Sequence, residues 1–559
     1  MSKSNLISMP RLSAIAGAVL GLSFAAASQA AGTIEFDNGA KFNWKGNLTY
    51  TLASRLKSPD PLLGSDGNKN FDKGALTSNR LGLLFESTLS KDKSGFVLSG
   101  STFYDDVYHR STDNRDALGT TGRPGHFNSR TKRYHGGYSR ILDAYAYTSF
   151  GVGDGDATVR LGSHVVSWGE SLFFPGISLA QGPADGTKSD VPGTETKDLL
   201  LPEDQLSLIY RPTADWALKA HWQYGWHETI APAPGSFMSD GEAVGPGASC
   251  LGPYVNIPAV PGMFEGYNGC SFGNRQADNK PKKGGQWGVG TTFRVTDETE
   301  VGLYYLNYHD RVPLPEVNVF TPGVALPDAF GGGEIGMGSY RIRYFDNIKL
   351  LGASFTTSLG MATLAGEISY KKNAPALVDA IVDPMSGEGM ASPTRARIVQ
   401  TNLNTFINYG RTAIADGTLV LAEMSYVDVS NAKKIKVPGV EAMGEFADFF
   451  PASNKLSFGG HGLAMSGMLV LTYYDVFSGW DLDIPISYEQ QLSGRTLVGG
   501  VGGEGDRRFS IGASLTYNQN LELGLTYTNY LGDAHVRTLK REKTLTDRDN
   551  ISFVVKYSF

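Results

Sequence analysis

Apolar and polar residues alternate with a period of two along most of this chain, and this alternation most limits its possible folds. From Phe42 to Leu52 every second residue is Phe, Trp, Gly, Leu, Tyr or Leu, and the residues between them are polar. The pattern recurs in other segments, among them 81–89, 216–227, 480–489 and 509–517. Each segment has one apolar and one polar face, and aromatic residues near segment ends are typical of strands that cross a membrane. The pattern predicts an all-β chain that forms a transmembrane antiparallel β-barrel.

The connections between these segments alternate strictly between short and long. Tight polar turns such as Asp92-Lys93-Ser94 and Asn518-Gln519-Asn520 separate long loops rich in Gly, Pro and Asp. The long loops are expected at about 57–76, 109–138, 169–203, 229–284, 312–346, 373–396, 429–460, 491–507 and 533–548. Outer-membrane barrels have short periplasmic turns and long outer loops, and counting by this rule predicts about 18 strands.

The two ends of the chain indicate export and insertion into the bacterial outer membrane. Residues 1–30 have a basic start, an apolar stretch and small residues before a cleavage point, as a secretory signal peptide does. Removal of this segment would leave 31–559 as a single barrel. Residues 31–559 contain no apolar run of about 18 residues, so the sequence predicts no transmembrane helix there. The last segment alternates up to Phe559. This end resembles the signal that hands outer-membrane barrels to their assembly machinery.

Composition and cysteine content exclude several other classes. Gly occurs 69 times, charged residues make up only 19 %, and the net charge of −6 gives no indication of nucleic-acid binding. Cys250 and Cys270 are the two cysteines, and both lie in the expected loop 229–284. In an exported chain they predict a disulfide that closes this loop. The absence of a neighbouring His or further Cys argues against a metal site, and no cofactor is expected.

Charged side chains are predicted inside the barrel, because we take the less apolar face of each strand as the inward one. The basic members come from the N-terminal half and the acidic members from the C-terminal half: Lys41, Lys45, Arg80, Arg160 and Lys219, and Glu367, Glu423, Asp481 and Asp483. A basic wall opposite an acidic wall would make a pore charge-selective. Alternatively these charges pair within a plugged lumen, and the sequence leaves both interpretations open.

The expected loop 169–203 is unusually apolar for a solvated loop. It contains Phe173, Phe174 and Ile177, and later Leu199 to Leu201. A barrel of about 16–18 strands is wide enough to leave an aqueous channel. The sequence therefore predicts that 169–203 is a lumen insert that narrows the opening.

The stretch from Val159 to Ser171 ends in Val-Val-Ser-Trp-Gly-Glu-Ser. It resembles a block in a large family of Gram-negative outer-membrane β-barrels of unassigned function. Residues 191–197, which read Val-Pro-Gly-Thr-Glu-Thr-Lys, also fit this family, as does the early Phe-Asn-Trp-Lys-Gly strand. The chain departs from the family pattern at His164, where Gln is common, and at Pro175, where Gly is usual.

The resemblance implies a place in traffic across the cell envelope. Members of the family are often found with a second exported protein of unknown function and an inner-membrane exporter of the resistance-nodulation-division (RND) type. They are associated with hydrophobic compounds and lipids. The expected partners are outer-membrane lipid and lipopolysaccharide, the barrel-assembly machinery, a periplasmic protein and the RND exporter.

The same resemblance implies a role for the Trp-Gly-Glu-Ser block. Trp168, Glu170 and Ser171 match the family motif and are expected to hold the inward segment in place. Trp168 would do so by packing. Glu170 would do so by a charge-assisted bond to a lumen arginine such as Arg160.

Three classes of function are compatible with these features. The first is a channel or conduit, passive or gated, for a small organic, hydrophobic or lipid-like molecule. The second is a structural barrel that docks a periplasmic complex. An outer-membrane lipase or protease is disfavoured, because none of the nine histidines lies in a His-Gly-Ser or Gly-x-Ser-x-Gly context. No catalytic residue is assigned.

Overall fold

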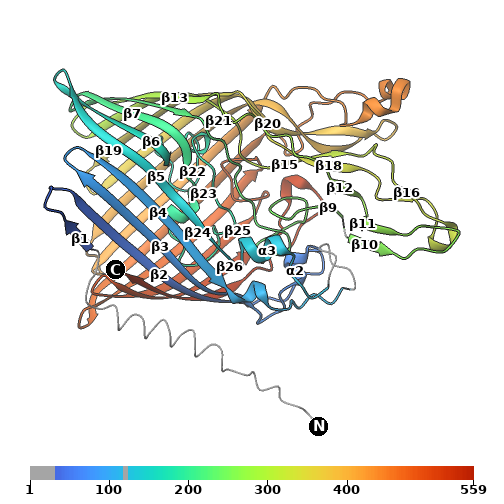
Figure 1. Cartoon of the computed structure of the whole chain (residues 1–559), viewed down its shortest axis with the longest axis horizontal. Helices are drawn as coiled ribbons and strands as arrows, with labels where there is room; N and C mark the ends of the chain where they lie inside the picture. Colours follow the sequence, from blue (N-terminus) through green and yellow to red (C-terminus); the bar gives the residue numbers. More distant parts are fainter. Residues whose placement is uncertain (1–31, 117–123, 253) are drawn as a thin grey trace, which may run out of the picture.

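The computed structural model describes residues 32–116, 124–252 and 254–559, so the expected signal peptide 1–30 lies outside the described residues. One sheet contains nineteen strands, and eighteen of them close into an antiparallel barrel in which β27 returns to β2 (Figure 1). In chain order the barrel strands are β2 (Lys41–Arg55), β3 (Leu76–Lys91), β4 (Ser94–Asp105), β5 (Gly137–Val152), β6 (Gly155–His164), β7 (Glu203–Thr213), β8 (Trp216–Gln223), β13 (Gln286–Arg294), β14 (Thr299–Tyr308), β19 (Ile348–Leu359), β20 (Ala362–Asp383), β21 (Glu388–Gly410), β22 (Gly417–Ser430), β23 (His461–Phe477), β24 (Trp480–Gly494), β25 (Arg507–Tyr517), β26 (Leu521–Leu531) and β27 (Asn550–Ser558). The predicted fold class and strand number are confirmed.

The alternation in the sequence separates an outer from an inner face on each strand. On β20, Ile368 and Tyr370 are exposed on the outside, whereas Glu367 and Ser369 are buried inside. Exposed apolar side chains recur on the outside of other strands, among them Leu161, Trp222, Leu303 and Leu351. An apolar outer band with a polar interior is the arrangement that a membrane-spanning barrel requires.

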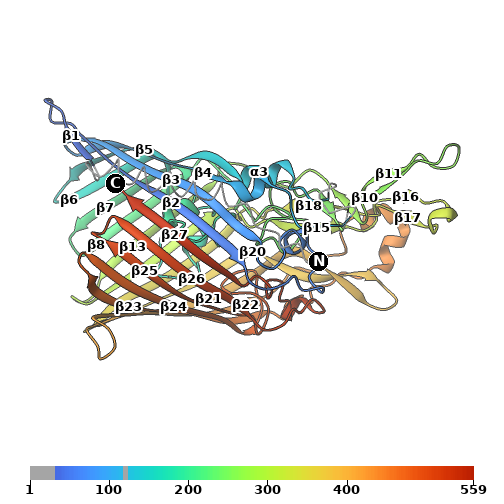
Figure 2. The ribbon, with the colours of Figure 1, turned by 90° about the horizontal axis from the view of Figure 1, so that it is seen from below.

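The pairing of β27 with β2 closes the barrel, and the C-terminal residue extends this pairing. The N–H of Gly46 donates to the carbonyl of Phe559 at 2.7 Å, and the N–H of Phe559 donates to the carbonyl of Gly46 at 2.9 Å. A Cβ atom on Gly46 would lie 2.5 Å from the ring of Phe559, so only glycine lets this ring cross the neighbouring strand. The C-terminus lies at the barrel end that carries the short turns, close to the small strand β1 (Gly32–Glu35) (Figures 1 and 2).

The opposite end of the barrel carries a lobe built from the long loops. Its four-stranded sheet contains β9 (Cys250–Leu251), β12 (Gly273–Arg275), β15 (Leu314–Asn318) and β18 (Ser339–Arg343). The hairpins β10 (Tyr254–Ile257) with β11 (Tyr267–Cys270), and β16 (Val324–Ala325) with β17 (Glu334–Ile335), extend farthest from the barrel (Figures 1 and 2). We call this end the long-loop end and the other the short-turn end.

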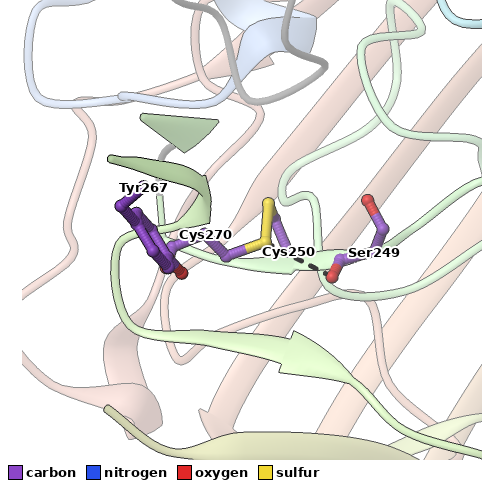
Figure 3. The surroundings of a disulfide bond; sticks show 4 residues. All are labelled: Ser249, Cys250, Tyr267 and Cys270. Atoms are coloured by element: carbon purple, nitrogen blue, oxygen red, sulfur yellow. Dashed lines mark hydrogen bonds between the residues drawn. A yellow bond between two sulfur atoms is a disulfide. The ribbon is translucent and has the colours of Figure 1, made fainter. Parts of the chain in front are cut away.

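The predicted disulfide between Cys250 and Cys270 is present in this lobe (Figure 3). Both cysteines are buried. The hydroxyl of Tyr267 donates to the carbonyl of Cys270 at 2.7 Å, and the Sγ of Cys270 lies 3.4 Å from the carbonyl oxygen of Ser249. The bond links β9 to β11 and so closes the loop.

One expected loop is wrong. Residues 373–396 belong mostly to a long hairpin, because β20 continues to Asp383 and β21 begins at Glu388. Asn373, with a φ of +64°, resembles a turn residue but instead forms a bulge in the pairing of β20 with β21. The extension is stable because the loop between β22 and β23 covers Val378 and Ala380. This loop contains the 3-10 helix η4 (Val440–Phe449).

The long loops contain the short helices α2 (Asp66–Lys69), η1 (Asp106–His109), α3 (Ser129–Tyr134), η3 (Asp328–Phe330) and η5 (Leu539–Arg541). A buried polar network joins α2 to the loop before β27. Arg55, at the end of β2, is fully buried and pairs with Asp547 at 2.8 Å. Both Arg55 and Arg548 donate to the side chain of Asn68. In the described part of the chain, no helix has the length and hydropathy needed to cross a membrane.

The packing of α2 should depend on pH through Glu242. Its carboxylate accepts the N–H of Asp66 at 2.7 Å, and burial together with the charge of Asp66 raises the pKa of Glu242 to about 7. Protonated Glu242 is thus favoured in the folded protein. Its contribution to the stability of the folded loops is complete below the ordinary pKa of 4.5 and is lost as the pH rises through about 7. We expect proteolysis of these loops in the folded protein to be faster at about pH 8 than at about pH 5.

The variant Glu242→Gln should remove most of this pH dependence. Glu265→Gln is the matched control, since Glu265 is exposed in the lobe and should leave the dependence unchanged. An unaltered pH dependence in Glu242→Gln would contradict the assignment.

Candidate functional site

The segment between β6 and β7 leaves the barrel wall and enters the lumen. β6 pairs only with residues 144–152 of β5, so the chain departs well before the long-loop end. The ring of His164 holds this departure point: its Nδ1 lies 2.9 Å from the carbonyl of Gly162 and its Nε2 lies 2.7 Å from the hydroxyl of Ser207. We call residues 165–202 the insert; it contains η2 (Ser178–Ala180) and α4 (Thr196–Leu199).

The buried carboxylate of Glu367, on β20, binds the backbone of the insert. Its Oε2 accepts the N–H of Glu170 at 2.8 Å, and its Oε1 accepts the N–H of Ile177 at 3.0 Å. Gly169 and Gly176 precede these two residues, and a Cβ atom on either would collide with a Glu367 oxygen. Glycine is therefore required at both positions so that the backbone can approach the carboxylate.

A second buried carboxylate, that of Glu423 on β22, binds the residues between these two points. Its Oε2 accepts the N–H groups of Leu172 at 3.2 Å and Phe174 at 2.9 Å, and also that of Phe173. From the strand between them, the amide of Asn402 donates to the carbonyl of Phe174 at 2.6 Å. The first part of the insert is thus bound through its backbone to one wall of the barrel.

The second part of the insert contacts the opposite wall through side chains. Glu195 accepts a hydrogen bond from Lys556 of β27 at 2.9 Å. Lys197 lies between two carboxylates and pairs with Glu86 of β3 at 2.5 Å and with Asp143 of β5 at 2.8 Å. The insert therefore spans the lumen from the β20–β22 wall to the wall around β27, β3 and β5.

An apolar cluster fills the lumen beside the first wall. The ring of Trp168 stacks on that of Tyr304 with centroids 5.8 Å apart. Ile177 is fully buried with Leu306 and Leu350, which are inward residues of β14 and β19. Packing of Trp168 and Ile177 removes apolar surface from water and adds to the polar contacts of the insert.

The loop between β24 and β25 also enters the lumen, and the sequence did not indicate this. Leu497 and Val498, between β24 and β25, pack against the same cluster. Gln400 and Asn402, on β21, were also missed as contacts of the insert. Their inward position follows from the alternation, but nothing in the sequence pairs them with a particular loop.

Two of the predicted basic lumen residues lie near the short-turn end and form ion pairs. Lys41 pairs with Glu35 of β1 at 2.6 Å, and Lys45 pairs with Glu86 at 3.0 Å. Both lysines are more than half exposed. Their charges are compensated locally, on the same side of the barrel.

The other predicted basic residues, Arg80, Arg160 and Lys219, lie on β3, β6 and β8. Arg80 is buried 3.7 Å above the ring of Phe103. Arg160 lies 5.8 Å from the ring centre of Tyr145. Within the part of the chain that the structure describes, neither Arg160 nor Lys219 forms an ion pair.

The predicted acidic residues divide into two pairs. Glu367 and Glu423 bind the insert, as described above. Asp481 accepts the N–H of Asp475 at 2.8 Å in the β23–β24 turn, and Asp483 accepts the hydroxyl of Thr472 at 2.5 Å. The structure does not bring the two pairs together, and charge selectivity stays a prediction.

The Trp-Gly-Glu-Ser block lies at the start of the insert. Trp168 packs in the apolar cluster, and Ser171 is half-buried. The expected bond between Glu170 and Arg160 is not formed among the described residues. The reason is that Arg160 stays on β6 beside Tyr145, whereas the backbone N–H of Glu170 binds Glu367 on the other wall.

Removal of the charge of Glu423 should loosen the first part of the insert. In Glu423→Gln the three N–H groups lose a charged acceptor, and hydrogen bonds to a charged group each contribute about 1.5–3 kcal/mol. We expect a cysteine introduced by Phe174→Cys, at a position that is 5% exposed, to react with a polar maleimide at least about tenfold faster in this variant. Asp481→Asn is the control, since Asp481 contacts a distant turn. Equal labelling rates in all variants would show that Glu423 does not hold the insert.

Comparison with solved structures finds outer-membrane proteins of low sequence identity. OccK9 (OpdG) of Pseudomonas aeruginosa is 12% identical with a TM-score of 0.40, over 94% of this chain and 100% of that chain. OccAB4 of Acinetobacter baumannii is 11% identical with a TM-score of 0.42, over 94% and 98%. Pseudomonas aeruginosa OpdK with vanillate is 10% identical with a TM-score of 0.38, over 92% and 98%. No curated protein matches the chain.

Comparison with protein families gives a match over nearly the whole chain. The model described as "Protein of unknown function (DUF1302)" matches residues 11–559. This match confirms the resemblance to a large family of unassigned function. The chain belongs to the DUF1302 family.

Proposed function

We propose that this protein is an outer-membrane conduit for a small organic, hydrophobic or lipid-like molecule, and that the insert gates it. The observation that carries the proposal is the insert, which spans the lumen between opposite walls through non-covalent contacts. A barrel of about 16–18 strands is wide enough for an aqueous channel, so an inward segment controls what passes. Localisation in the outer membrane is supported by the apolar outer face of the barrel.

A movable insert is favoured over a permanent plug. The two cysteines of the chain both lie in the outer lobe, so no disulfide ties the insert to the wall. The ion pairs of Glu195 and Lys197 with the opposite wall are partly exposed, and such pairs can be exchanged for contacts with water at a modest net cost. Movement of residues 165–202 would leave the strand pairing of the barrel intact.

Transport across the whole envelope belongs to the same proposal. The family resemblance implies a second exported protein and an RND exporter as partners, and hydrophobic or lipid-like compounds as cargo. The short-turn end would face the periplasm and meet these partners, because short turns are periplasmic in outer-membrane barrels.

A structural docking barrel is the second candidate function, and the lobe at the long-loop end favours it. The lobe is stiffened by a disulfide and presents an exposed Met263 and Phe272. An enzyme is less well supported. His164 contacts the hydroxyl of Ser207, but its other nitrogen faces the Gly162 carbonyl and not a carboxylate, so this pair lacks the third member of a triad.

Single-channel recording in planar bilayers tests the conduit. We expect the intact protein to be mostly closed with brief openings, and a variant without residues 172–202 to conduct steadily. Glu367→Gln/Glu423→Gln, which keeps the full chain, should open more often than the intact protein.

A deletion of residues 258–265 in the outer lobe is the matched control and should behave like the intact protein. Steady conductance of the intact protein would overturn the gate. Silence of all variants, with barrels shown to be folded, would overturn the conduit and favour the docking barrel.

A further inference from the structure

A cavity of about 260 Å³ lies where the insert returns to the barrel wall. Its lining includes Tyr145 and Arg160 from the wall, and Lys197, Leu200 and Pro202 from the insert. We call it the return chamber.

The return chamber contains one cation whose hydrogen-bond donors are free. Arg160 forms no hydrogen bond or ion pair with the residues that the structure describes, and its guanidinium lies 5.8 Å from the ring centre of Tyr145. Asp143 and His164 line the same cavity. Lys197 is different, because Glu86 and Asp143 already bind its ammonium group. A guanidinium offers five N–H donors in a planar fork that matches a carboxylate.

The return chamber also has an apolar side. Leu200 is 42% exposed although it lies inside the barrel, and Pro202 and Val165 line the same cavity. Apolar surface left in contact with water is unfavourable, and a ligand that covers it gains the corresponding free energy. The two sides together match a molecule with a charged head and an apolar body.

We propose that the return chamber binds a small amphipathic carboxylate, with its head on Arg160 and its apolar tail on Leu200 and Pro202. Typical sites for drug-sized ligands have about 300–1,000 Å³, so the chamber fits a short-chain acid and not a whole phospholipid. The inference rests on the proposed conduit, for which it names the class of cargo. Binding to the chamber, however, can be measured without transport.

The test uses the full-length protein in phosphatidylcholine nanodiscs and octanoate as the probe. Calorimetric titration should show saturable binding beyond the partitioning seen with empty nanodiscs. Arg160→Gln should weaken octanoate binding about tenfold or more, since a charge-assisted bond is lost. Leu200→Asn should also weaken it. Arg160→Lys should retain part of the affinity.

One control variant and two control ligands test the charged head and the apolar tail separately. Arg211→Gln removes an arginine that is half exposed beside Asp156 on the neighbouring strand, and it should leave binding unchanged. Octanamide lacks the charge and acetate lacks the tail, so both should bind at least about tenfold more weakly than octanoate. Heat-modifiable mobility in gels shows that each variant is a folded barrel.

Several results would overturn the inference. These are no saturable binding by the intact protein, equal affinity in Arg160→Gln, or equal affinity for octanoate and octanamide. Acetate that binds as tightly as octanoate would also overturn it. The proposed conduit is tested separately by conductance. Octanoate binding to a protein that never conducts would support the binding site in the return chamber and would contradict the conduit function. Conductance without binding would overturn the chamber alone.

Discussion

Two buried carboxylates facing five backbone N–H groups are the interaction on which the interior of this barrel depends. A chain segment inside a barrel cannot pair with the sheet, and its backbone groups still need partners. Glu367 and Glu423 supply them for the first part of the insert. A buried carboxylate is itself costly unless it accepts hydrogen bonds. The carboxylates therefore satisfy the backbone N–H groups of the insert, and these N–H groups in turn stabilise the buried carboxylates.

This arrangement divides the lumen into two unlike halves. Beside β14 and β19 it is filled by the buried apolar cluster around Trp168 and Ile177. On the side of β3, β5 and β6 it stays polar, with cavities between the wall and residues 191–202. We expect the proposed conduit to follow the polar half, where these cavities lie. The free guanidinium of Arg160 lies in that half, where a passing solute would meet it.

The barrel could be predicted from sequence because its two signals are local. Alternation is set by the geometry of a single strand, and short turns are set by neighbouring residues, so each can be recognised without knowing its partner. Residues 373–396 were misjudged because Asn373 and Pro375 resemble a turn, and the loop that covers Val378 lies more than fifty residues further along the chain. The predicted bond between Glu170 and Arg160 was wrong for the same reason. A lumen carboxylate and a lumen arginine look equally suitable in sequence, and only the path of the insert decides which wall it meets.

The two parts of the insert are held by contacts of different character, and this difference bears on how it could move. Residues 169–177 are held through backbone groups by wall carboxylates that are 4% and 1% exposed, where salt screens little. Residues 195–197 are held by ion pairs whose side chains are 23–33% exposed at the Glu195–Lys556 contact. Partly exposed ion pairs are weak and are weakened further by salt. The ion pairs of Glu195 and Lys197 should therefore separate first, whereas Asp185, which is fully buried and pairs with Arg140 of β5 at 2.9 Å, keeps the middle of the insert on the same wall. The return chamber is lined by Lys197, so in the proposed gate a ligand bound to Arg160 and Leu200 would act on this weaker attachment.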